Sequence, residues 1–445
     1  MTSGAIRPLI IRFALPLVAG NLFQQLYNTI DCIIVGNYVG KEALAAIGST
    51  GSLINAVIGF FMGLSAGGGV VISQFFGAHK TDCVRRTVHT MMLSGMIAGA
   101  ALIFFGRLAA PPILRFMRTP DDVFEMASSY LTIYFSGAFF QMVYNVASGI
   151  LRALGDSARP LYFLVASSAV NVALDFLFVV GLGWGIQGAA HATVASQAVA
   201  MALVLLVMVK SDDVYSLRLA ELRVHADSLV RVLRQGLPGG IQMSVTAFSN
   251  VFVMSYINRF GSACMAGWSC FSKIDQISLL PIQSVSLSVT TFTGQNYGAG
   301  NMKRVREGVL TALRLAFMWN VLLVAVFELL PGQLVGMFNR DAGVLYYGTF
   351  FLRVGAPFYV FRVFNQVFAG ILRGMGNALA PTVVMLSGFV VFRQLYLLVV
   401  TGITDSFVPV SLVYPAGWCL SGLLMPAAYA LHMRRTRRNV HRDGA

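Results

Sequence analysis

Long apolar stretches recur along the whole chain, and they constrain its fold more than any other feature. Each is about 20 residues or longer, which is enough to cross roughly 30 Å of hydrocarbon as an α-helix. Only 11% of the 445 residues are charged. We therefore expect an all-α integral membrane protein with twelve spans: 10–35, 44–74, 84–107, 124–150, 160–181, 186–209, 232–257, 264–293, 308–331, 343–372, 380–402 and 407–432.

The chain contains an internal repeat. The segments GILRALGDSARP (149–160) and GILRGMGNALAP (370–381) are near copies of each other, 221 residues apart. The same offset relates QFFGAHKTDCVR, which begins at Gln74, to QNYGAGNMKRVR, which begins at Gln295. Collinear repetition in a very apolar chain is typical of secondary transporters, whose halves move against each other around a central site.

The repeat and the spans together predict the domain organisation. Residues 1–210 form an N-terminal lobe of six helices, and 228–433 form a C-terminal lobe of six more. Residues 211–227 are a polar cytoplasmic linker, and 434–445 are a basic cytoplasmic tail. Because six is an even number, the two lobes run parallel and are related by a pseudo-twofold axis along the membrane normal.

The net charge of +14 is distributed unevenly. Lys and Arg concentrate in the loops and tails that share one side with both termini, and few lie opposite. By the positive-inside rule, both termini are expected to be cytoplasmic in a multi-pass protein of the cytoplasmic (inner) membrane. The basic charge thus needs no nucleic-acid partner, and the tail is expected to touch anionic membrane lipids.

Two carboxylates and an amide lie deep inside spans of the first half, where burying them is costly. Asp31 is deep in the first span, and Asn171 and Asp175 share one face of the fifth because they are four residues apart. Two carboxylates and an amide can bind a hard cation through oxygen or hold a proton. The second half offers no matching groups, since its equivalent positions are Val253, Phe392 and Tyr396.

Other residues inside the spans are secondary candidates. Lys273, Asp275 and Arg393 suggest an ionic site in the second half, although two residues of separation point Lys273 and Asp275 in different directions. Pro16 in the first span and Pro238 in its equivalent each remove a backbone donor. We expect Pro16 to act as a gating kink.

Two matches to enzyme motifs lack their structural context. Gly63-Leu-Ser65-Ala-Gly67 has the G-x-S-x-G form of a hydrolase elbow, but it lies inside an apolar span and is read as small residues for helix packing. The G-x-G-x-x-G pattern at 183–188 connects two spans without a βαβ unit. With no P-loop or H-E-x-x-H pattern, we expect neither an enzyme nor a cofactor.

With these residues assembled, the chain resembles the multidrug and toxic compound extrusion (MATE) family over essentially all twelve spans. The resemblance rests on PLVAGNLFQQLYNTIDCIIVGNYVGKEALAAIG, on ILRALGD and ILRGMGN, and on NVALDFLF followed by GIQGAAHATV. It implies two six-helix lobes that open a central cavity alternately inward and outward. The resemblance also implies export of organic, often cationic, amphipathic compounds, driven by inward flow of Na⁺ or H⁺.

The resemblance carries specific residues. A cation site in the N-terminal lobe of such proteins uses an Asp, an Asn and Asp pair, and a Thr, matched here by Asp31, Asn171, Asp175 and Thr193. No metal other than Na⁺ is implied there. Relatives with an acid in the tenth helix would place it near Arg362, so the chain is more similar to the DNA-damage-inducible protein F branch. Candidate residues for lining the substrate cavity are Gln24, Asn28, Gln141 and Asn145.

The hypothesis is therefore a monomeric cation-coupled antiporter for small organic cations. A flippase for a lipid-linked saccharide is the main alternative, favoured if several intramembrane arginines line a wide cavity. A channel and an intramembrane hydrolase acting through Ser65 are weaker alternatives.

Overall fold

The computed structural model describes residues 1–117 and 119–443, and within them every regular element is helical. Each of the twelve expected spans falls on one helix or on a run of consecutive helices. Eight helices in the described part of the chain are long and apolar enough to cross a membrane. The last two residues of the expected tail, 444–445, lie outside the described residues, and the rest of it continues the final helix.

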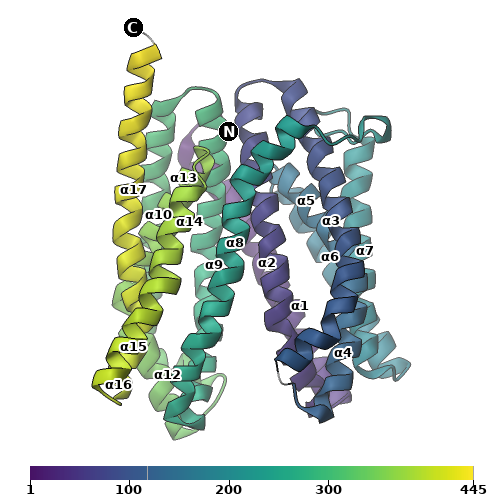
Figure 1. Ribbon diagram of the computed structural model, residues 1–445, viewed down its shortest axis with the longest axis vertical. Coiled ribbons are helices and arrows are strands. Elements are labelled where there is room, and N and C mark those ends of the chain that lie inside the picture. Colours follow the sequence, from purple (N-terminus) through teal and green to yellow (C-terminus); the bar gives the residue numbers. More distant parts are fainter. Residues whose placement is uncertain (118, 444–445) are drawn as a thin grey trace. The chain divides into compact units, whose positions relative to one another are not determined.

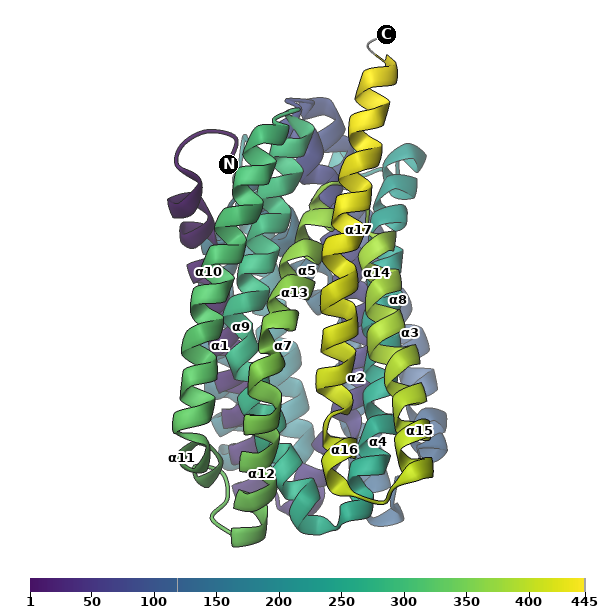
Figure 2. The ribbon, with the colours of Figure 1, turned by 90° about the vertical axis from the view of Figure 1, so that its left-hand side faces the viewer.

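The chain packs into two compact units (Figures 1 and 2). The N-terminal unit comprises residues 15–240, and the C-terminal unit comprises residues 1–14 together with 241–445. The division falls inside α1 (Ile6–Tyr38) and α8 (Ala226–Ile257), within two residues of Pro16 and Pro238. The six-helix lobes with their boundaries at 210 and 228 stay a prediction.

The N-terminal unit is built from long helices packed around two apolar clusters. α3 packs on α4 and α5, and α7 packs on α4, α5 and α6. Besides parts of α1 and α8, its elements are α2 (Lys41–Gly77), α3 (Thr81–Phe116), α4 (Asp121–Ser136), α5 (Ala138–Leu154), α6 (Ala158–Asp175), the π-helix η1 (Phe176–Gly181), α7 (Gly185–Lys210) and the 3₁₀ turn η2 (Leu219–Glu221).

The C-terminal unit has the corresponding arrangement, with α13 packed between α9 and α17 and with α17 running along α14 and α15 (Figure 2). Two apolar clusters form its core. Its further elements are η3 (Asn258–Phe260), α9 (Ser262–Gly298), α10 (Met302–Leu329), α11 (Pro331–Gly336), α12 (Ala342–Gly355), η4 (Ala356–Phe358), α13 (Tyr359–Gly374), α14 (Leu379–Leu386), the π-helix η5 (Ser387–Phe392), α15 (Arg393–Ile403), α16 (Phe407–Ser411) and α17 (Val413–Asp443).

The repeated motif folds into the same helix–turn–helix in both units. Gly155 and Gly376 have φ values of 104° and 84°, a left-handed conformation that ends the preceding helix at little cost. One residue later, the Asp156 carboxylate accepts from Ala158 N and the Asn377 amide oxygen accepts from Ala380 N, each at 3.1 Å. The sequence similarity between the two segments therefore reflects the same turn conformation in both units.

The linker is docked rather than free. Buried His89 of α3 uses both ring nitrogens: Nδ1 lies 2.8 Å from the Arg85 carbonyl oxygen, and Nε2 accepts from the backbone N–H of Arg218 at 3.2 Å. Arg85 also pairs with Glu221 at 2.9 Å. The Arg159 guanidinium donates to the Tyr215 hydroxyl at 2.6 Å. These contacts hold the linker on the N-terminal unit.

Close helix approach in the N-terminal unit depends on glycines of α2. A Cβ at Gly63 would lie 2.3 Å from Gly240 N, and one at Gly67 would lie 2.2 Å from Gly236 N and Cα. Only residues without side chains allow these backbones to meet. The interpretation of this segment as a packing motif agrees with these contacts.

Candidate cation-binding site

Three of the expected cation ligands lie on two helices of the N-terminal unit. Asn171 and Asp175 project from one face of α6 and are 1% and 0% exposed. Asp31 lies on α1, partly buried, and its carboxylate is near enough to Asp175 for the two to interact electrostatically. The structure thus brings together carboxylates that are 144 residues apart in the sequence.

The oxygen atoms of this cluster are buried without hydrogen-bond partners in the described chain. They are Oδ1 of Asp31, the amide oxygen of Asn171 and both carboxylate oxygens of Asp175. Buried carboxylates are costly unless a counter-charge or a proton compensates them. The donor set is oxygen-rich and acidic, which suits a hard monovalent cation or a proton.

Thr193, the fourth expected ligand, lies on α7, which packs against α6. Its hydroxyl donates to the Ala189 carbonyl at 3.0 Å, so its oxygen keeps lone pairs for a further contact. Asp175 is the last residue of α6, and the π-helix η1 begins directly after it. Single π turns inside helices often mark functional positions.

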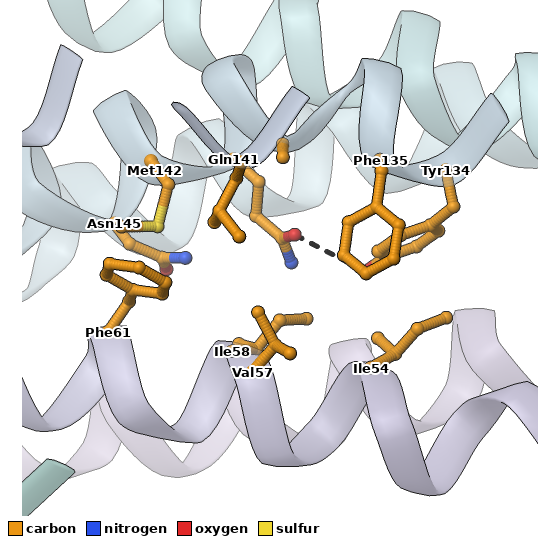
Figure 3. Close-up of a pocket in the computed structure, with 11 residues that line it drawn as sticks. Ile54, Val57, Ile58, Phe61, Tyr134, Phe135, Gln141, Met142 and Asn145 are labelled. Atoms are coloured by element: carbon orange, nitrogen blue, oxygen red, sulfur yellow. Dashed lines mark hydrogen bonds between the residues drawn. The ribbon is translucent and has the colours of Figure 1, made fainter. Parts of the chain in front are cut away.

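The four amide side chains expected to line a substrate cavity lie in two separate parts of the N-terminal unit. Gln141 and Asn145 of α5 line a narrow pocket of about 10 Å³, facing Ile58 and Phe61 of α2 (Figure 3). Tyr134 donates to the Gln141 side-chain oxygen at 3.3 Å. Gln24 and Asn28 do not line this pocket and are exposed on α1. The pocket is therefore mostly apolar, with a few polar groups.

A separate ionic cluster lies in the C-terminal unit. Arg362 donates to Asp275 Oδ1 at 2.5 Å, and the Tyr359 hydroxyl donates to the same oxygen. The Arg362 guanidinium also lies over the Trp418 ring, 4.5 Å from its centroid. Lys273 takes no part in this pair, and its ammonium lies 5.8 Å from the Phe338 ring centroid.

Sequence reasoning did not foresee the pairing of Asp275 with Arg362. The two residues are 87 apart and on different helices, α9 and α13. The available signal was an acid and a base inside spans of the same half, since a buried charge favours a partner of opposite sign.

Ser65 is a packing residue, which does not favour the hydrolase alternative. It is 6% exposed, and its hydroxyl donates to the Asn145 carbonyl at 3.1 Å. Ser286, its equivalent in the repeat, likewise donates to the Gln366 carbonyl at 2.6 Å. A serine that repeats the same helix–helix hydrogen bond in both units is explained by packing alone.

The sequence of the chain is similar to those of known proteins. The MatE family model matches residues 16–177 and 238–396. The chain is 31% identical over 396 residues to the "Probable multidrug resistance protein YpnP" of Bacillus subtilis, covering 88% of each chain. It is 25% identical to the "Probable multidrug resistance protein NorM" of Thermotoga maritima, covering 85% of this chain and 82% of that one.

Solved structures give the same fold. A crystal structure of MATE in the bent conformation matches with a TM-score of 0.92 at 24% identity, covering 98% of this chain and 97% of that one. The family match spans well over half of the chain and includes both halves of the repeat. The protein is therefore a transporter rather than an enzyme, and it belongs to the MATE family of multidrug efflux transporters.

Proposed function

We propose that the protein is a cation-coupled antiporter that exports organic, cationic amphipathic compounds by alternating access. The observation that carries this proposal is the buried, unpartnered oxygen cluster of Asp31, Asn171 and Asp175. Thr193 completes the proposed donor set from α7. The coupling ion, Na⁺ or H⁺, is a transported substrate and not a resident cofactor.

The proposed cycle follows from the charge of the cluster. With the cavity open outward, the two carboxylates take up the cation, which removes their mutual repulsion and lets them come together. α1 then shifts near Pro16, because the proline interrupts its hydrogen-bond ladder. The organic cation leaves outward, and inward opening discharges the coupling ion. We place both termini in the cytoplasm and the protein in the inner membrane as a monomer.

The flippase alternative receives less support from the intramembrane arginines. Arg362 is engaged by Asp275, and Arg393 is buried among hydrogen-bond acceptors of the C-terminal unit.

The test uses proteoliposomes loaded with a fluorescent organic cation and pulsed with Na⁺ or a pH step. Wild-type transport should follow one ion and disappear in Asp31→Asn and in Asp175→Asn, while Asn171→Ala should show a milder loss. Asp405→Asn is the matched control, since Asp405 is an exposed carboxylate outside the cluster. Ion-independent transport by the wild type, or unchanged transport by Asp31→Asn, would contradict the proposal. Passive equilibration without accumulation would indicate a channel.

A further inference from the structure

The C-terminal unit contains a buried guanidinium that no carboxylate pairs with among the described residues. Arg393 is 3% exposed and is the first residue of α15, directly after the π-helix η5. Its Nε donates to the Phe389 carbonyl at 2.5 Å, and its Nη2 donates to the side-chain oxygens of Asn250 at 2.9 Å and Ser249 at 3.3 Å. The Tyr414 ring centroid lies 4.8 Å away. The cation is thus held by neutral oxygens and an aromatic face.

The internal repeat shows which residues of the N-terminal unit correspond to the surroundings of Arg393. The offset of 221 residues places Asn171 at Phe392, the neighbour of Arg393, and places Thr193 at Tyr414. α8, which supplies the amide and hydroxyl acceptors, is the counterpart of α1. Arg393 therefore lies where the equivalents of three helices meet, and in the N-terminal unit those helices carry the proposed cation cluster.

The two positions are complementary in charge. In the N-terminal unit, carboxylate oxygens are buried without a cation from the chain. In the C-terminal unit, a cation from the chain is buried with amide, hydroxyl and carbonyl oxygens, which are the groups that bind a dehydrated cation, and with a ring that favours positive charge. The Ser249 hydroxyl also accepts from the Gln394 amide at 3.1 Å and donates to the Phe389 carbonyl at 3.0 Å, so these oxygens form one network around the guanidinium.

We propose that Arg393 is a tethered cation that permanently occupies the C-terminal counterpart of the coupling-ion site. This inference rests on the proposed function, because it assigns ion exchange to the N-terminal cluster alone. A cation that cannot dissociate keeps α8, α15 and α17 in one charge state throughout the cycle. The C-terminal unit then packs as a fixed body, and the free ion enters and leaves at Asp31 and Asp175.

Chemical rescue tests the proposal in proteoliposomes, using the ion that drives the wild type. Arg393→Lys should retain most transport because it keeps a cation on a flexible stem. Arg393→Met and Arg393→Ala should lose at least about tenfold in transport. Each hydrogen bond from the guanidinium to α8 favours the transport-competent packing of α8 on α15 by about that factor, and both variants remove these bonds. Millimolar guanidinium should restore transport to the alanine variant, because the free cation can enter the space vacated by the side chain.

The matched control is Arg314→Ala, which removes an exposed arginine from α10. It should keep its transport, and guanidinium should not change it. Wild-type transport by Arg393→Met would overturn the proposal, as would a folded alanine variant that guanidinium does not restore. If the alanine variant does not fold, the proposal is tested by comparing Arg393→Met with Arg393→Lys. Equal transport by these two variants overturns the proposal. An inactive wild type instead refutes the proposed function.

Discussion

The glycine contact between α2 and α8 allows a quantitative test of how the N-terminal unit is packed. Gly67→Ala adds one methyl group, which would lie 2.2 Å from the backbone of Gly236, whereas ordinary van der Waals contact begins at 3.4 Å. The obstacle is backbone, so it cannot rotate aside as a side chain would. Overpacking of this kind costs about 1–3 kcal/mol, and we expect the upper part of that range.

The measurement is the apparent midpoint of thermal unfolding of the purified protein in detergent. Gly67→Ala should lower it by several degrees relative to the wild type. Gly48→Ala is the matched control on the same helix, because a Cβ at Gly48 would meet no atom within 4 Å. Alanine there should leave stability unchanged or raise it by about 0.5–1 kcal/mol, since glycine is a poor helix former. If Gly67→Ala unfolds at the same temperature as Gly48→Ala, the close contact with Gly236 is refuted.

Two further predictions concern charge and backbone. Asp275→Asn should cost about 1.5–3 kcal/mol of stability, because it leaves the partly buried Arg362 without its carboxylate, and the double variant with Arg362→Gln should recover much of that loss in the same unfolding assay. His79 has a φ of 57°, and the repeat places Gly300, with a φ of 72°, at the equivalent turn. His79→Gly should therefore raise stability by up to about 1 kcal/mol, and a fall in the unfolding midpoint would contradict the reasoning.

Much of the fold was predictable because membrane helices and repeats leave strong one-dimensional signals. Apolar length locates the spans, and the copied LRALGD and LRGMGN segments locate equivalent turns. Helix interruptions were not predictable in the same way. The break at Gly137 between α4 and α5, and the π turns η1 and η5, change hydrogen bonding without changing the apolar pattern.

The candidate sites were likewise predictable only in part. Asn171 and Asp175 are four apart, so helical periodicity alone places them on one face. Their proximity to Asp31, and that of Arg362 to Asp275, depends on how separate helices pack. Composition shows that buried charges need partners, but it does not say which residues the fold brings together.

The division of α1 between the two units has a consequence for how the chain folds as it is synthesised. Residues 1–14 are synthesised before residues 241–445, yet they belong to the same unit, in which the Arg304 guanidinium donates to the Ser3 carbonyl at 3.0 Å. Residues 15–240, by contrast, can complete their own packing as soon as the first half of α8 has been inserted. The first turns of α1 therefore lack their packing partners until roughly three hundred further residues have been synthesised and inserted into the membrane.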